Sequence, residues 1–102
     1  MRQFDLYENP ATPMRGAVPF VLVLSSHLLG DLTEVIVAPV LAGRNAPLNA
    51  FEIPVQHDET TLLVSVTGMT AIRRRDLRRR MGSMQTYEDD IRRAVDRLFT
   101  GF

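Results

Sequence analysis

Two nearly continuous apolar runs of strand length lie in the first half of the chain, at residues 18–24 and 35–41. Runs of this length are typical of strands that are covered on both faces, and their β-branched content favours strand over buried helix. Residues 51–56 instead alternate between apolar and polar side chains, which predicts a half-buried strand. Because Pro54 has no N–H to donate to a neighbouring strand, we expect this strand at an edge of the sheet.

Shorter segments are expected to complete the sheet. Residues 3–7 are predicted to form an opening strand, and residues 9–16 carry the prolines and the glycine that favour a turn. Residues 57–60 are predicted to form a hairpin turn that leads into a strand at 62–66. Because no repeat or low-complexity linker divides the sequence, residues 1–102 are expected to form a single domain.

The final segment has the pattern of an amphipathic helix. Its apolar side chains fall on one stripe at helical spacing, at Tyr87, Ile91, Ala94, Val95, Leu98 and Phe99. Thr86 is predicted to cap this helix, with an acidic residue three positions later as in a capping box, and Gly101 is predicted to end it. The stripe predicts that Leu98 and Phe99 anchor the helix to the sheet, so that residues 100–102 project from it. Strands followed by one helix indicate an α+β fold.

Composition narrows the class of protein. The sequence has no cysteine, so neither a disulfide framework nor a thiolate metal site can form. No apolar run reaches the roughly 20 residues that a membrane-spanning helix needs, and the first residues lack an apolar signal stretch. We therefore expect a soluble, cytoplasmic protein that does not insert into a membrane.

The sequence offers little support for catalysis. Its two histidines, His27 and His57, lie in predicted loops, and neither has a second ligand at metal-binding spacing. No serine lies in a nucleophile elbow, and no glycine-rich loop is present that could hold a phosphate. We therefore expect a protein that is not an enzyme and that has no metal site and no cofactor.

The charges are unevenly distributed although the formal net charge is zero. All twelve cationic side chains are arginines, and half of them lie in one short segment, at Arg73, Arg74, Arg75, Arg78, Arg79 and Arg80. Clustered arginines can bind a phosphate backbone, but this segment has no aromatic residue for base stacking. They can also bind the carboxylates of an acidic protein segment in a bidentate manner. A solvated loop without a partner is the third interpretation, and all three stay open.

Four stretches of the sequence carry a resemblance to a known protein family. They are Gln3-Phe4-x-x-Tyr7, Phe20-Val21-x-Val23-x-Ser25 with Leu28-Leu29 after it, Val37-Ala38-Pro39-Val40, and Ile91-x-x-Ala94-Val95-x-x-Leu98-Phe99-x-Gly101-Phe102. In this order they resemble the CcdB-type toxins of bacterial toxin–antitoxin modules, over essentially the whole chain. The resemblance implies an SH3-like barrel: a mostly antiparallel β-sheet with a small wing sheet and one C-terminal α-helix, paired into a twofold homodimer.

The same resemblance implies a function without catalysis. CcdB-type toxins bind the A subunit of DNA gyrase and trap the enzyme with both DNA strands cleaved. A cognate CcdA-like antitoxin neutralises the toxin and helps to repress transcription of their shared operon. Direct binding of nucleic acid by this chain is not expected, except through the antitoxin complex.

The resemblance also implies two sets of site residues. The gyrase contact maps onto Thr100, Gly101 and Phe102, with Asp96 at a helix position that is asparagine in the best-known pattern. The antitoxin contact maps onto Gln3, Tyr7, Ser25, Ser26, Leu28 and Leu29. The arginine-rich segment lies between sheet and helix and is a second candidate surface for an acidic antitoxin tail.

One departure from the family pattern leaves alternatives open. Thr100 stands where the family usually has a tryptophan, and a threonine cannot fill the pocket that such an anchor fills. A non-toxic relative that retains only antitoxin or operator-complex binding is therefore one alternative. A MazF-like ribonuclease toxin is the other, and it would have to use His27 or His57 together with arginines.

Overall fold

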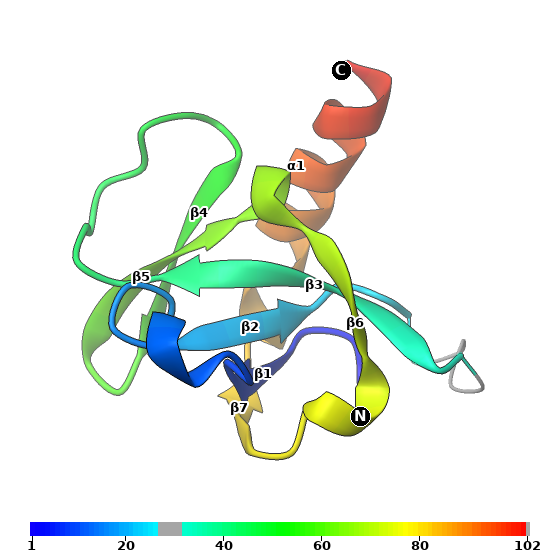
Figure 1. The fold of residues 1–102 in the computed structure, drawn as a ribbon. Helices are drawn as coiled ribbons and strands as arrows, with labels where there is room; N and C mark the ends of the chain where they lie inside the picture. Colours follow the sequence, from blue (N-terminus) through cyan, green and yellow to red (C-terminus); the bar gives the residue numbers. More distant parts are fainter. Residues whose placement is uncertain (27–31, 102) are drawn as a thin grey trace.

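Seven strands form one curled antiparallel sheet in the computed structural model, which describes residues 1–26 and 32–101 (Figure 1). The strands are β1 (Asp5–Glu8), β2 (Phe20–Val23), β3 (Glu34–Leu41), β4 (Glu52–His57), β5 (Thr60–Ser65), β6 (Thr70–Arg73) and β7 (Arg80–Ser83). Their order across the sheet is β4-β5-β3-β2-β1-β7, and β6 pairs with β3. The helix α1 (Glu88–Thr100) follows the last strand. The predicted α+β class, with a half-open antiparallel barrel and a C-terminal helix, is confirmed.

The central strand β3 changes its neighbour part-way along its length. Its residues 34–37 pair with β6, whereas Val40 and Leu41 pair with β5. Pro39 lies between these two stretches and cannot donate a ladder hydrogen bond there. The short 3-10 helix η3 (Val66–Gly68) connects β5 to β6, and these two strands leave β3 in different directions (Figure 1).

Buried side chains form two clusters, one on each face of the sheet. The first packs between the sheet and α1 and includes Leu6, Leu22, Val64 and Ile91. The second consists of Tyr7, Val21, Val23, Val35, Val37 and Leu77. Successive residues of a strand point to opposite faces, so a strand whose residues belong alternately to the two clusters is covered on both sides. This explains why the two apolar runs in the sequence are nearly continuous.

The hairpin of β4 and β5 stands at one end of the sheet. Pro54 lies on β4, the outermost strand, and its predicted edge position is confirmed. Asp58 and Glu59 take φ values of 49° and 66°, which are the left-handed values of a two-residue hairpin turn. The hairpin joins β3 through two residue pairs at the end of that strand. The small wing that the resemblance implies is therefore an extension of the main sheet.

Two predicted element starts are wrong. β1 begins at Asp5 rather than at residue 3, because Phe4 has a φ of 70° and this left-handed conformation interrupts the extended backbone. Thr86 does not cap α1, because it lies within the 3-10 helix η5 (Gln85–Tyr87) that precedes it. The N-cap position is Tyr87, which makes no side-chain cap hydrogen bond. Its hydroxyl instead accepts a hydrogen bond of 2.9 Å from the Gln56 N–H and so ties the helix start to β4.

The predicted helix end is confirmed. Gly101 has a φ of 79° and donates its N–H to the Arg97 carbonyl at 2.8 Å, as a left-handed C-cap does. Acidic side chains occupy the first turn of α1, where the helix dipole favours them. Within the described ranges, no helix has the length and apolar character needed to cross a membrane.

Candidate functional site

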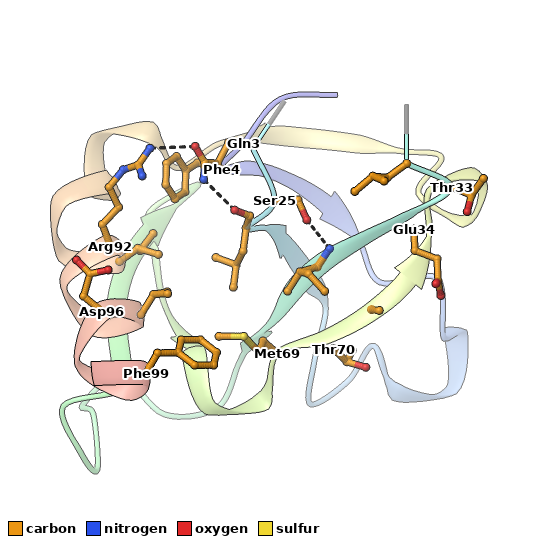
Figure 2. Close-up of a pocket in the computed structure, with 16 residues that line it drawn as sticks. Gln3, Phe4, Ser25, Thr33, Glu34, Met69, Thr70, Arg92, Asp96 and Phe99 are labelled. Carbon is orange, nitrogen blue, oxygen red and sulfur yellow. Dashed lines mark hydrogen bonds between the residues drawn. The ribbon is translucent and has the colours of Figure 1, made fainter. Parts of the chain in front are cut away.

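A groove with a volume of about 760 Å³ lies between α1 and the first half of β3 (Figure 2). Its helix wall is formed by Ile91, Arg92, Val95, Asp96 and Phe99. Its opposite wall is formed by Leu24, Ser25, Leu32, Thr33, Glu34, Ile36, Met69, Thr70 and Ala71. Gln3 and Phe4 lie together at one end (Figure 2). The groove therefore brings the N-terminal segment, the end of β2 and the C-terminal helix to one surface.

The polar groups at one end of this groove are bonded to one another. The Gln3 side chain donates to the Leu24 carbonyl at 2.8 Å and accepts from the Arg92 guanidinium at 3.0 Å. Arg92 also donates to Glu88 at 2.8 Å, and its guanidinium carbon lies 5.4 Å from the centre of the Phe4 ring. These contacts hold the Arg92 guanidinium at one end of the groove, where its side chain is still half exposed.

Phe4 is held in an unusual backbone conformation at the groove. Its φ of 70° lies in the left-handed region, which a residue with a side chain adopts at a free-energy cost of about 1–2 kcal/mol. Two backbone hydrogen bonds fix it there: its N–H donates to the Val23 carbonyl at 2.7 Å, and its carbonyl accepts from the Met84 N–H at 2.8 Å. The conformation places the aromatic ring beneath Arg92.

Ser25 links the end of β2 to β3 at the edge of the groove. Its hydroxyl oxygen accepts a hydrogen bond of 2.6 Å from the Ile36 N–H, just beyond the last residue pair that joins β2 to β3. The side chain of Ile36 itself is exposed toward the groove. Within β3, burial alternates, so that Val35 and Val37 are buried and Ile36 is open. The apolar run in the sequence does not reveal this difference.

The residues implied as an antitoxin contact are distributed over more than one surface. Gln3 and Ser25 line the groove, and Ser26 follows Ser25 directly. Tyr7 is buried in the second cluster, where burial and the neighbouring Asp5 carboxylate raise the pKa of its hydroxyl. Leu28 and Leu29 lie outside the described residues.

The end of α1 is the most exposed apolar part of the helix. Leu98 is half-buried and packs against the first cluster, but Phe99 is 70% exposed. The prediction that both residues anchor the helix is therefore wrong for Phe99. The last turn of α1 extends past the strands of the sheet (Figure 1), so the continuing apolar stripe has no sheet to pack against.

The residues implied as a gyrase contact surround this exposed end. Asp96 lines the groove, and its backbone carbonyl accepts a hydrogen bond of 2.6 Å from the Thr100 hydroxyl. Gly101 follows as the C-cap. Phe102 lies outside the described residues. Asp96, Phe99, Thr100 and Gly101 are hereafter called the helix tip.

The arginine-rich segment and the helix tip lie at opposite ends of the molecule (Figure 1). The segment spans the end of β6, the 3-10 helix η4 (Arg74–Asp76) and the start of β7. His57 is separate from both. Its side chain is 14% exposed and lies 3.4 Å from Asp58, and its ring meets Phe20 edge-on at 5.1 Å.

The shortest ion pair in the described residues holds the loop before β4. Arg44 donates to both carboxylate oxygens of Glu52, at 3.1 Å and 2.7 Å, and the Leu48 N–H donates to Glu52 at 2.7 Å. The Arg44 hydrogen bond, followed by that from Leu48, lowers the pKa of the Glu52 carboxyl to about 2. This pair stabilises the loop rather than the groove.

Chemically, the groove offers apolar side chains along its walls and, at one end, the mutually bonded side chains of Gln3 and Arg92. Among residues 1–26 and 32–101, no three His, Cys, Asp or Glu side chains are placed to share a metal ion. Apolar side chains that face an open groove are suited to receiving side chains of another protein.

Comparisons with known proteins agree with this architecture. A family model described as "CcdB protein" matches residues 3–101. The solved structure named "Mycobacterium tuberculosis toxin MazF-mt6" is 24% identical, with 96% of each chain covered and a TM-score of 0.72. A second, named "Crystal structure of Mtb toxin", is 28% identical over 76% of this chain and 88% of that chain, with a TM-score of 0.65. No curated protein matches the sequence.

The family match confirms the resemblance that the four sequence stretches carry. The match to the first solved structure shows a shared fold over nearly the whole of both chains. Sequence reasoning missed Ile36, Met69 and Phe99 as exposed or groove-lining residues. Their apolar character made them candidates for the core, but Ile36 and Phe99 are exposed, and Met69 is only partly buried against the first cluster.

Proposed function

Since the chain belongs to the CcdB family, we propose that it is the toxin of a toxin–antitoxin module and binds the A subunit of DNA gyrase through its helix tip. The observation that supports this most directly is Phe99. A large aromatic side chain that is 70% exposed at the end of an otherwise packed helix has the character of an interface anchor.

Phe99 also offers an aromatic side chain next to residue 100, where this chain departs from the family pattern. The family resemblance places a tryptophan there, whereas this chain has Thr100, whose hydroxyl is bonded to the Asp96 carbonyl. We propose that Phe99 supplies the aromatic contact in this protein. The left-handed Gly101 ends the helix directly after Phe99 and Thr100. Trapping gyrase with cleaved DNA needs binding at this tip and no catalytic group on the toxin.

The groove is proposed to receive the cognate antitoxin. Gln3 and Ser25 line it together with Asp96 and Phe99. An antitoxin segment in the groove would therefore contact part of the helix tip and compete with gyrase for it. We also propose that the active form is the homodimer that the family resemblance implies, which sedimentation of the purified protein would test.

A DNA-cleavage assay tests the gyrase proposal. Purified gyrase, supercoiled plasmid and the toxin are incubated, and linear DNA is measured after detergent and protease treatment. We expect linear DNA to accumulate with the wild-type protein and to disappear with Phe99→Ala and with deletion of residues 100–102. Leu48→Ala is the matched control, because Leu48 is 76% exposed on a loop outside the groove. Undiminished cleavage by both tip variants would refute the role of the tip.

A MazF-like ribonuclease is the second candidate, and the structural similarity to a toxin of that name favours it. A ribonuclease needs an accessible general acid or base. His57 is largely buried against Phe20, and His27 lies outside the described residues. Incubation of the protein with single-stranded RNA distinguishes the two functions, and we expect intact RNA. Antitoxin binding without gyrase binding would instead indicate the third candidate, a non-toxic relative.

A further inference from the structure

The arginine-rich segment is built around one buried residue. Leu77 is 7% exposed and packs in the second cluster with Tyr7 and Val35. The six arginines lie on both sides of it in the sequence. Leu77 therefore fixes the middle of the segment to the sheet and leaves its flanks at the surface.

Backbone hydrogen bonds fix the segment at further points. The Arg74 N–H donates to the Thr33 carbonyl at 2.9 Å, and the Leu77 N–H donates to the Arg74 carbonyl at 3.1 Å. The Glu8 N–H donates to the Arg79 carbonyl at 2.9 Å. The segment is thus not a free loop. A surface whose backbone is already ordered loses less conformational entropy when a partner binds.

Only some of the arginines serve the fold itself. Arg80 lies 3.3 Å from Asp5, whose side chain is almost fully buried, so this arginine compensates an internal carboxylate. Arg79 lies 3.7 Å from Glu8, which Arg15 also contacts at 3.1 Å. Glu8 therefore offsets only part of the charge around it.

The other exposed arginines of the segment have no such partner. Arg73, Arg75 and Arg78 are exposed, and none of them forms an ion pair with a carboxylate in residues 1–26 and 32–101. Uncompensated like charges held close together repel one another. Arg73 faces Glu34 across the β3–β6 ladder, but no carboxylate of the described residues lies within salt-bridge distance of these three guanidinium groups, which leaves them available to a partner.

A depression lies beside Arg78, one of these three arginines. Its volume is about 610 Å³, and Arg78 and Arg79 line it together with Arg15. The opposite side is formed by the turn that contains Pro10 and Thr12. Arg78 and Arg79 therefore border a concave surface with room for part of an extended chain, and Arg75 precedes them in the sequence.

We propose that the arginine-rich segment docks an extended acidic peptide segment of a partner protein, whose carboxylates pair with Arg73, Arg75 and Arg78. Guanidinium groups bind carboxylates through two parallel hydrogen bonds. The docking surface is distinct from the groove and the helix tip. It does not depend on gyrase being the target.

Two observations favour carboxylates over a nucleic acid backbone. The segment contains no aromatic side chain on which bases could stack. In addition, Glu8 and Asp76 line the depression. A phosphate backbone carries a charge at each step and would meet these carboxylates, whereas acidic side chains can be spaced to avoid them.

Fluorescence anisotropy tests this surface. The probe is a labelled peptide of alternating glutamate and serine, and the same peptide with glutamine in place of glutamate is the uncharged control. The test variant is Arg75→Gln/Arg78→Gln. The matched control variant is Arg93→Gln/Arg97→Gln, which removes the same charge from exposed positions on α1. Circular dichroism melting confirms that both variants fold.

We expect the glutamate peptide to bind the wild-type protein more weakly as salt increases. The test variant should weaken binding by about fivefold to tenfold, since two exposed ion pairs are lost, and the control variant by less than about twofold. Arg75→Lys/Arg78→Lys should restore most of the binding.

Three outcomes would overturn the proposal. One is equal loss in the test and control variants, which would indicate a general charge effect. Another is the absence of peptide binding at low salt. The third is tighter binding of a labelled DNA duplex or single-stranded RNA that depends on the same two arginines, which would assign the surface to nucleic acid. None of these results bears on the gyrase-cleavage assay, because that assay probes the opposite end of the molecule.

Discussion

Arg92 and Gln3 are joined by a hydrogen bond of 3.0 Å between guanidinium and side-chain oxygen, although they are 89 residues apart in the sequence. The bond ties α1 to the N-terminal segment at one end of the groove. Removal of either side chain breaks the same hydrogen bond, so each substitution should lower the free energy of unfolding through the loss of that bond. In a double-mutant cycle of Gln3→Ala and Arg92→Ala, we expect a coupling energy of about 0.5–1 kcal/mol in urea unfolding. Strict additivity of the two single effects would show that the bond contributes nothing in solution.

The helix tip should be separable from the stability of the fold. Phe99 is exposed whereas Ile91, two turns earlier, is fully buried. We expect Phe99→Ala to change the free energy of unfolding by no more than about 0.5 kcal/mol. Ile91→Ala should lower it by about 2–5 kcal/mol, because it leaves a cavity in the first cluster. Thermal or urea unfolding measures both, and a large loss of stability in Phe99→Ala would mean that the ring packs against the protein after all.

The pair of Arg44 and Glu52 should make stability depend on pH in the acid range. The pKa of the Glu52 carboxyl is about 2 in the folded protein, below its ordinary value of 4.5. The folded state therefore binds this proton less readily than the unfolded chain. The stabilisation is fully present above pH 4.5 and is lost as the pH falls toward 2.

The substitution Glu52→Gln tests this dependence. We expect the difference in urea midpoint between wild type and variant to be largest above pH 4.5 and to narrow as the pH approaches 2. Glu59→Gln, at the exposed hairpin turn, provides a carboxylate control outside the pair. A difference that stays constant across this range would exclude Glu52 as the source of the acid sensitivity.

The close approach of Gly68 to Pro39 predicts a strong effect of one added methyl group. A Cβ at residue 68 would lie 2.8 Å from Pro39 Cγ and 3.2 Å from its Cδ, and both atoms belong to a rigid ring. We expect Gly68→Ala to lower the free energy of unfolding by about 1–3 kcal/mol, as overpacking does.

Gly16→Ala is the matched control for this substitution. No atom lies within 4 Å of the Cβ position at Gly16, so the added methyl group meets no neighbour and restricts the unfolded chain. We expect a neutral effect or a gain of about 0.4–1 kcal/mol. Equal unfolding midpoints for the two variants would show that β3 and η3 can move apart without loss.

Most of the secondary structure could be predicted because it follows from local chemistry. The two apolar runs predicted strands that are covered on both faces, and Pro54 predicted the sheet edge, since a proline lacks the donor that an inner strand needs. Gly101 predicted the helix end through its tolerance of the left-handed conformation. Phe4 could not be predicted in the same way. Its left-handed φ depends on hydrogen bonds to Val23 and Met84, which are distant in the sequence.

The sequence alone therefore determined the segments of β1 to β5 and of the helix, which family they resemble and where the cationic charge is concentrated. It did not predict β6 and β7, which form at the two ends of the arginine-rich segment. Only the tertiary structure decided which apolar side chains lack a covering neighbour. Periodicity places Phe99 on the same stripe as Leu98, but the sheet ends before the helix does, so Phe99 is exposed. Likewise, Leu77 is a buried anchor because the sheet face beneath it is apolar, and this gives the arginines beside it a fixed place at the surface.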